Sequence, residues 1–281
     1  MGFDPARVTE LVMKMAREFK VRDMGRPSYF LGIETVAHGD GMLLSQGRYM
    51  NDILKRNSMV DCKALATPVS LVQSDEVSDV PYADPMQYRS LAGAPQYLTV
   101  TRPDLSFAVN RLCQHMHSPT TTHWSMLKRV LRYVKGTVHY GLRIGKSQSL
   151  GVHAFSDSDW VGDPNNQKST SGFTVFLGAN LISWTYWKQR ILARLSTEAE
   201  YKALTDVSPE VTWLVSLIKE LGLPPVSSPK LWCDNLGATY FCTNPVFYPR
   251  TKHVEIDYHF IRDKVSKKEI RVNFISTKNM E

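Results

Sequence analysis

The C-terminal half of the sequence constrains the fold most, because its apolar runs alternate between strand and helix patterns and end in acidic residues. Residues 149–155 (SLGVHAF) carry apolar side chains and no charge, which predicts a buried strand, and Asp157 and Asp159 follow at its exit. Segments 171–177 (SGFTVFL) and 181–187 (LISWTYW) are rich in β-branched and aromatic residues. Because the GAN between them is typical of a turn, they predict a hairpin.

The next segment changes to a helical period. Between Thr197 and Gly222 apolar residues recur every three or four positions, which predicts one long helix with Glu200 in its first turn. A short strand at 230–233 (KLWC) ends in Asp234, and helical sequence follows it.

A basic helix near 254–268 and a strand at 269–275 complete the order β-β-β-α-β-α-α-β. We therefore predict an α/β fold for residues 148–281, in which helices flank a mixed five-stranded sheet. The chain as a whole is then α+β, because the preceding residues predict a hairpin and a helical region of their own.

Three acids stand at the edges of three of these elements: Asp157, Glu200 and Asp234. Carboxylates on adjacent strands and a facing helix can converge on divalent ions, so the arrangement indicates a metal site. Each acid also has an ordinary explanation, since Asp234 can cap the helix after it and Glu200 is a first-turn acid of the kind that the helix dipole favours. Asp159 and Glu198 are the neighbouring alternatives.

Motifs in this half of the chain resemble the ribonuclease H domain of copia-type LTR retrotransposon Pol polyproteins: SDSDW, STSGF, LISW, STEAEYKAL, LWCDN and RTKHVEIDYHFIRDKV. Upstream motifs resemble the end of the same polyprotein's reverse transcriptase: YFLGIE, LLSQGRYMNDILKR, YRSLAGAPQYLTVTRPDLSFAVNRL and LKRVLRYVKGT. The motifs follow the family's order over nearly the whole chain from about Glu10. We therefore expect a C-terminal fragment of such a polyprotein.

The resemblance implies a ribonuclease H-like fold and metal-dependent hydrolysis of the RNA strand of an RNA–DNA hybrid. Asp157 occupies the family's first catalytic position, which favours it over Asp159. Glu200 precedes the aromatic residue of its motif, which favours it over Glu198. Together with Asp234 these acids are the expected catalytic residues and ligands of Mg²⁺ or Mn²⁺, with two ions in the family and no small-molecule cofactor. Hard carboxylate oxygens suit these ions.

The sequence also departs from the family's pattern. The family's fourth carboxylate follows the last strand, in a segment written roughly Gln-Leu-Ala-Asp, whereas this sequence ends in ISTKNME. We therefore expect that residue to be missing and Asp257 to be the one nearby acid that offers a substitute. The polymerase motif Tyr-x-Asp-Asp does not occur in the 281 residues. The expectation is a truncated, impaired hydrolase without polymerase activity, and the alternative is a non-catalytic nucleic-acid-binding remnant.

The motifs and composition predict four parts along the chain. Residues 1–66 are the distal part of a reverse-transcriptase palm, and residues 67–87, rich in Pro, Ser and Asp, are a linker. A helical connection region at 88–147 and the ribonuclease H-like domain at 148–281 follow.

A basic segment within the connection region is the predicted nucleic-acid interface. Residues at i, i+4 and i+7 share one helix face, and such a face can track the phosphates of a duplex. The ordinary explanation is a solvated helix face. The basic residues of the segment are Lys128, Arg129, Arg132, Lys135, Arg143 and Lys146.

Composition supports a nucleic-acid partner and argues against a zinc-knuckle, a disulfide-rich, a membrane or a secreted protein. The formal net charge is +7, which favours a polyanionic ligand. The four cysteines form no CxxC pair, so neither a zinc knuckle nor a disulfide framework is expected. No run of about 18 apolar residues and no signal peptide is found, so we expect a cytoplasmic or nuclear protein without membrane contact.

Overall fold

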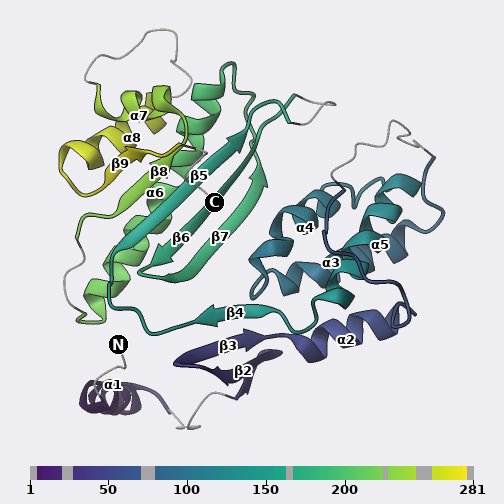
Figure 1. Cartoon of the computed structure of the whole chain (residues 1–281). Coiled ribbons are helices and arrows are strands. Elements are labelled where there is room, and N and C mark those ends of the chain that lie inside the picture. Colours follow the sequence, from purple (N-terminus) through teal and green to yellow (C-terminus); the bar gives the residue numbers. More distant parts are fainter. Residues whose placement is uncertain are drawn as a thin grey trace. The chain divides into compact units, whose positions relative to one another are not determined.

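The chain forms two compact units, Met1–Gln148 and Ser149–Glu281, in the computed structural model (Figure 1). The structure describes residues 5–20, 28–70, 80–162, 167–223, 227–244 and 255–276.

The first unit combines a small sheet with a group of helices. Its strands β1 to β4 form an antiparallel sheet in that order. The strands are β1 (Tyr29–Phe30), β2 (Ile33–His38), β3 (Gly41–Ser45) and β4 (Gly141–Ile144). The helices are α1 (Pro5–Glu18), α2 (Gly47–Arg56), α3 (Pro85–Leu98), the 3₁₀ helix η1 (Pro103–Leu105), α4 (Ser106–Cys113) and α5 (Thr121–Gly136).

Residues 88–147 were predicted to be helical, but they include strand β4. Its four residues pair with β3 from Met42↔Ile144 to Ser45↔Gly141, so the chain returns to the N-terminal sheet after α5. The close approach needs a glycine, because a Cβ on Gly141 would collide with the Leu44 carbonyl oxygen. The predicted four-part division stays a prediction, and residues 71–79 of its linker lie outside the described residues.

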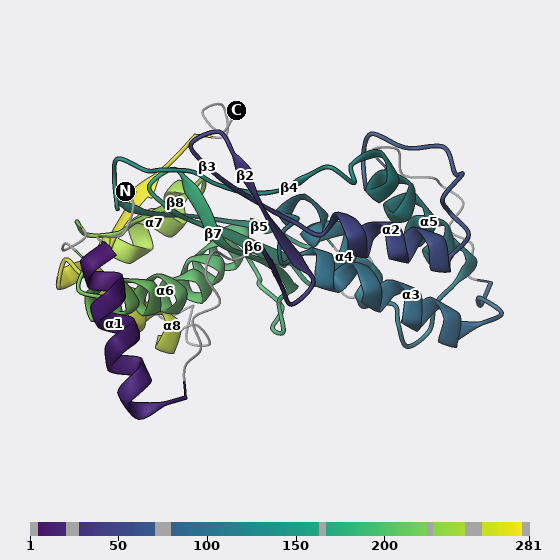
Figure 2. The same cartoon turned by 90° about the horizontal axis from the view of Figure 1, so that it is seen from below.

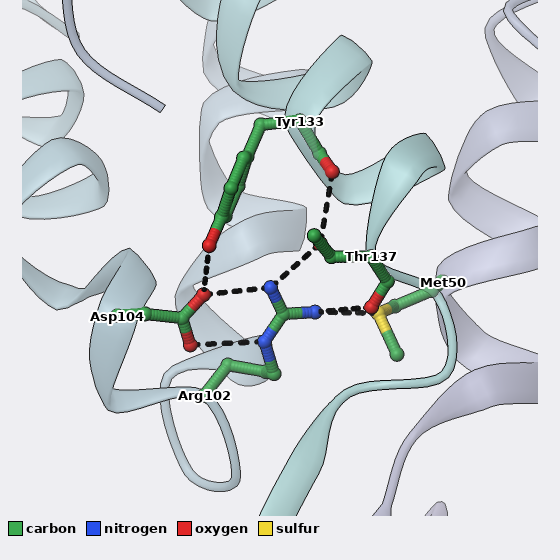
Figure 3. Close-up of polar contacts among 5 residues, drawn as sticks. All are labelled: Met50, Arg102, Asp104, Tyr133 and Thr137. Carbon is green, nitrogen blue, oxygen red and sulfur yellow. Dashed lines mark hydrogen bonds and ion pairs between the residues drawn. The ribbon is translucent and has the colours of Figure 1, made fainter. Parts of the chain in front are cut away.

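A buried arginine joins three of the helical elements of this unit (Figure 3). Arg102 is 1% exposed, and its guanidinium donates to both carboxylate oxygens of Asp104 at 2.9 and 2.7 Å. It also donates to the carbonyl and the hydroxyl of Thr137 at 3.0 and 2.8 Å and contacts the Met50 sulfur at 3.3 Å. Tyr133 donates its hydroxyl to Asp104 at 2.8 Å. The charge of the buried guanidinium is therefore paired and its donors are used, which is the condition for burying a charged side chain.

The second unit confirms the predicted α/β fold with a mixed five-stranded sheet flanked by helices. The strand order is β7-β6-β5-β8-β9, antiparallel between β5, β6 and β7 and parallel between β5, β8 and β9. Its strands are β5 (Val152–Asp159), β6 (Thr170–Leu177), β7 (Asn180–Lys188), β8 (Lys230–Cys233) and β9 (Arg271–Phe274). Its helices are α6 (Ser196–Glu220), α7 (Leu236–Thr243) and α8 (Glu255–Ser266), so the order along the chain is the predicted one.

Helix α6 lies along one face of this sheet, and α7 and α8 pack against it (Figures 1 and 2). The core between sheet and helix includes Val152 and Ala154 of β5, Leu231 of β8, and Leu204 and Val211 of α6. Successive residues of β5 alternate between buried and more exposed, as a strand with one covered face requires.

Strand β5 begins and ends later in the chain than the predicted strand at 149–155. Asp157 and Asp159 lie inside it rather than beyond its end, because β6 pairs with it as far as Asp159↔Thr170. The first acid of the expected site is therefore held by a regular strand, not by a loop.

Candidate metal centre

Two parallel strands, β5 and β8, and helix α6 place the three predicted acids near one another. Strands β5 and β8 pair at Phe155↔Trp232. Continuing this register by two residues places Asp157 beside Asp234, which directly follows β8. Helix α6 supplies Glu200 from the covered face of the sheet.

Glu200 is the buried member of the group, at 5% exposure. Its Oε1 accepts a hydrogen bond from the backbone N–H of Ser158 at 2.9 Å, and its Oε2 accepts one from the thiol of Cys233 at 3.7 Å. Burial, followed by the charges of Asp157 and Asp234, raises the pKa of Glu200 to about 8. The two hydrogen bonds oppose this shift but do not cancel it.

Asp234 is half-buried and directly follows β8. Burial, followed by the charge of Asp157, raises its pKa. It does not cap α7, because Asn235 is the cap and accepts from Ala238 N at 3.0 Å. Helix capping is therefore excluded as the explanation for Asp234.

Asp157 is exposed and lies in a row of residues across three strands. It pairs with Gly172 of β6, and Gly172 pairs with Tyr186 of β7. The Tyr186 ring covers the glycine, since a Cβ there would lie 2.7 Å from it. Burial and then the charge of Asp157 raise the pKa of Tyr186. This aromatic neighbour of the site was missed from the sequence, because only the strand register reveals it.

The alternative acids have local partners instead. Glu198 accepts from the backbone N–H of Arg194 at 2.8 Å, which anchors the segment before α6. The carboxylate of Asp159 lies directly against Gly162 in the following turn. The choice of Asp157 and Glu200 over these two acids stays a prediction. For Asp257 the structure describes the backbone, within α8, but not the side chain.

The donor set suits a hard divalent cation. Glu200, Cys233 and Asp234 each have one ligand atom within 4.8 Å of the other two. The charge of Asp157 contributes to the raised pKa of Glu200 and of Asp234. Carboxylate oxygens are the protein ligands that Mg²⁺ and Mn²⁺ prefer. Burial raises the pKa of the Cys233 thiol above its usual range, which favours the protonated form. The sequence placed Cys233 only within the predicted strand 230–233, because its bond to Glu200 depends on the fold.

The predicted nucleic-acid interface is divided between two elements. Lys128 on α5 is exposed, with its Nζ 5.8 Å from the Trp124 ring centroid. Arg143 lies on β4, not on the helix, and pairs with Asp40 at 3.6 Å on the surface. Lys146 follows β4 and is exposed.

The other three basic residues of α5 bind the chain segment 60–67. These contacts hold that segment along the helix, so part of the basic face has an intramolecular role that the sequence did not indicate. The bonds run from Arg129 Nη2 to Thr67 Oγ1 at 2.8 Å, from Arg132 Nε to the Lys63 carbonyl at 2.7 Å and from Lys135 Nζ to the Val60 carbonyl.

Comparison with known proteins gives the family. Residues 1–71 match the family model described as reverse transcriptase (RNA-dependent DNA polymerase). The retrovirus-related Pol polyprotein from transposon RE2 of Arabidopsis thaliana is 45% identical over 277 residues, which is 98% of this chain and 19% of that polyprotein. This chain belongs to the copia-type retrotransposon Pol polyproteins. It spans about a fifth of the length of the polyproteins it matches.

The chain is also similar to a second plant protein and to a solved structure. An uncharacterized mitochondrial protein of Arabidopsis thaliana is 48% identical over 203 residues, 72% of this chain and 85% of that protein. The crystal structure of LC11-RNase H1 in complex with RNA/DNA hybrid matches with a TM-score of 0.34 and 13% identity, over 45% of this chain and 86% of that one. Among the described residues, no helix is both long enough and apolar enough to cross a bilayer.

Proposed function

We propose that Ser149–Glu281 is a ribonuclease H-type domain that hydrolyses the RNA strand of RNA–DNA hybrids with divalent ions, Mg²⁺ or Mn²⁺, held by Asp157, Glu200 and Asp234. The observation that supports this most is the proximity of Glu200 on α6 and Asp234 after β8, which have ligand atoms within 4.8 Å of one another and both feel the charge of Asp157 on β5. The motif order and the membership of the Pol family point to the same reaction.

The convergence favours a cation for electrostatic reasons. Three carboxylates close together repel one another, and a buried one gains a proton instead of a charge. The raised pKa values of Glu200 and Asp234 have this origin, after burial itself. A bound divalent cation would reverse the repulsion and keep all three ionised at neutral pH.

The residues of this chain would orient the reacting groups. The Ser158 N–H and the Cys233 thiol hold the two oxygens of Glu200, so this carboxylate presents a fixed direction to an ion. Asp157 is exposed, so its carboxylate would be accessible to a substrate phosphate. When bound, the two ions expected from the family would activate a water molecule and stabilise the leaving oxygen.

Metal binding and hybrid cleavage by the full chain test this function. We expect Asp157→Asn and Asp234→Asn to weaken Mn²⁺ binding at least tenfold in calorimetric titration and to abolish hybrid cleavage. Asp263→Asn, an exposed acid on α8, is the matched control and should change neither. Asp257→Asn tests whether that residue is a fourth ligand. Equal Mn²⁺ affinity in the wild type and both site variants would overturn the proposal.

The second candidate is a nucleic-acid-binding domain without catalysis. The net charge of +7 and the exposed Lys128 and Lys146 favour it. Salt-dependent hybrid binding by a Mn²⁺-loaded chain that cleaves nothing would select this function over hydrolysis.

A further inference from the structure

A buried amide lies directly behind the site. Gln189 follows the last residue of β7 and is 1% exposed. Its Nε2 lies 2.6 Å from Ser171 Oγ, 3.2 Å from Ser158 Oγ and 3.1 Å from the Ala199 carbonyl oxygen. This side chain therefore bridges β6, β5 and α6.

Two of these contacts reach the residues that hold Glu200. Ser158 donates its backbone N–H to the Glu200 carboxylate at 2.9 Å while its hydroxyl accepts from Gln189. Ala199 immediately precedes Glu200 in α6. One amide thus binds the strand residue that orients the carboxylate and the peptide that carries it.

The buried amide of Gln189 is only partly hydrogen-bonded. The Gln189 Oε1 atom has no hydrogen-bond partner among the described residues, and three acceptors share only two N–H hydrogens. An apolar side chain of the same length would fill the space without burying an unpaired oxygen.

We propose that Gln189 is a positioning residue, which sets the distance between β5 and α6 at Ser158 and so aims the Glu200 carboxylate at the metal ions. The inference rests on the proposed metal function of this site. Partners that orient metal ligands from behind commonly change metal affinity by about 10–100-fold when they are removed.

Mn²⁺ affinity of the full chain tests the role of Gln189. Gln189→Met keeps the length of the side chain and removes its hydrogen-bond donors. We expect the dissociation constant for Mn²⁺ to increase about tenfold. The far-UV circular dichroism spectrum should stay unchanged. Gln46→Met is the matched control. Gln46 is also fully buried and accepts from Thr101 at 2.8 Å, but it belongs to the first unit, so its loss should lower thermal stability without changing Mn²⁺ affinity.

A second substitution keeps the test decisive. Gln189→Asn retains an amide but withdraws it by one methylene, and it should weaken Mn²⁺ binding to a similar extent even where Gln189→Met fails to fold. A folded Gln189→Asn or Gln189→Met variant with wild-type Mn²⁺ affinity would overturn the role of Gln189 alone. A wild-type chain that binds no Mn²⁺ would instead overturn the proposed function.

Discussion

The carboxyl of Glu200 makes the stability of the second unit depend on pH. Its pKa is about 8 in the folded chain and about 4.3 in an unfolded one, so between these values the folded state keeps a proton that the unfolded state has released. Stability contributed by that proton is complete below about pH 4 and is lost as the pH rises towards 8. We expect the metal-free wild type to unfold at progressively lower temperature from pH 5 to pH 8.

Glu200→Gln should remove most of this dependence, because the amide is neutral at every pH. Thermal unfolding in a chelating buffer at pH 5, 6, 7 and 8 measures it. Mn²⁺ at pH 8 should raise the midpoint of the wild type more than that of the variant, since the ion stabilises only the state that binds it. The same slope with pH in both proteins would contradict the buried, proton-binding state of Glu200.

The ion pair between the buried guanidinium of Arg102 and the carboxylate of Asp104, which is 35% exposed, predicts a clear effect in the first unit. Burial would raise the pKa of Asp104, but hydrogen bonds from Arg102 and its charge lower it overall, so the carboxylate stays ionised. Arg102→Met removes the bidentate hydrogen bonds to Asp104 and the two bonds to Thr137, and we expect a loss of about 1.5–3 kcal/mol in the free energy of unfolding of this unit.

Arg48→Met is the control for this substitution. Its pair with Glu34, at 3.2 Å, leaves the Arg48 side chain 76% exposed, so the loss should stay within about 1 kcal/mol. Urea unfolding of both variants measures the difference. Comparable losses would show that the Arg102 network is not the stabilising centre of the unit.

Elements with local signals were predictable from the sequence. The apolar period of α6 and the GAN turn between β6 and β7 predicted a helix and a hairpin that the structure confirms. Gly178 in that turn has φ of +61°, a conformation that favours glycine. Strand β4 was not predictable, because its four residues are specified by pairing with β3, almost 100 positions earlier in the chain.

Helix α5 carries the prediction that belongs to the element scale. Replacing Lys128, Arg132 and Lys135 by Ala should reduce the slope of log K against log salt for hybrid binding, by about one for each phosphate contact that is lost. Lys128→Ala alone should change the slope without changing stability, because that side chain is exposed. Arg132→Ala should also lower stability, since it frees the Lys63 carbonyl. Fluorescence anisotropy at several salt concentrations measures the slope, and an unchanged slope would assign this face to a structural role.

At the scale of the whole molecule, the sequence indicated the three acids but not what holds them. The hydrogen bonds of Glu200 reach Ser158 and Cys233, which lie 42 and 33 positions away. Such contacts depend on the register of β5 against β8 and on where α6 crosses the sheet, and neither is encoded in a local pattern. The role of Gln189 was not predictable either. In the sequence it is a polar residue just after the end of a predicted strand, and only the fold shows that its side chain is buried.

The two units should fold independently, because each has a core of its own. The buried apolar cluster of the first unit runs from Met50 to Val134 in sequence, and that of the second from Val152 to Ile270. We therefore expect Ser149–Glu281, produced alone, to unfold in one cooperative transition that coincides with one of two transitions of the full chain. Mn²⁺ should shift this transition equally in both proteins and leave the other unchanged. Calorimetry with and without Mn²⁺ measures this, and an unfolded fragment, or one with clearly weaker Mn²⁺ affinity than the full chain, would show that the metal centre depends on residues of the first unit.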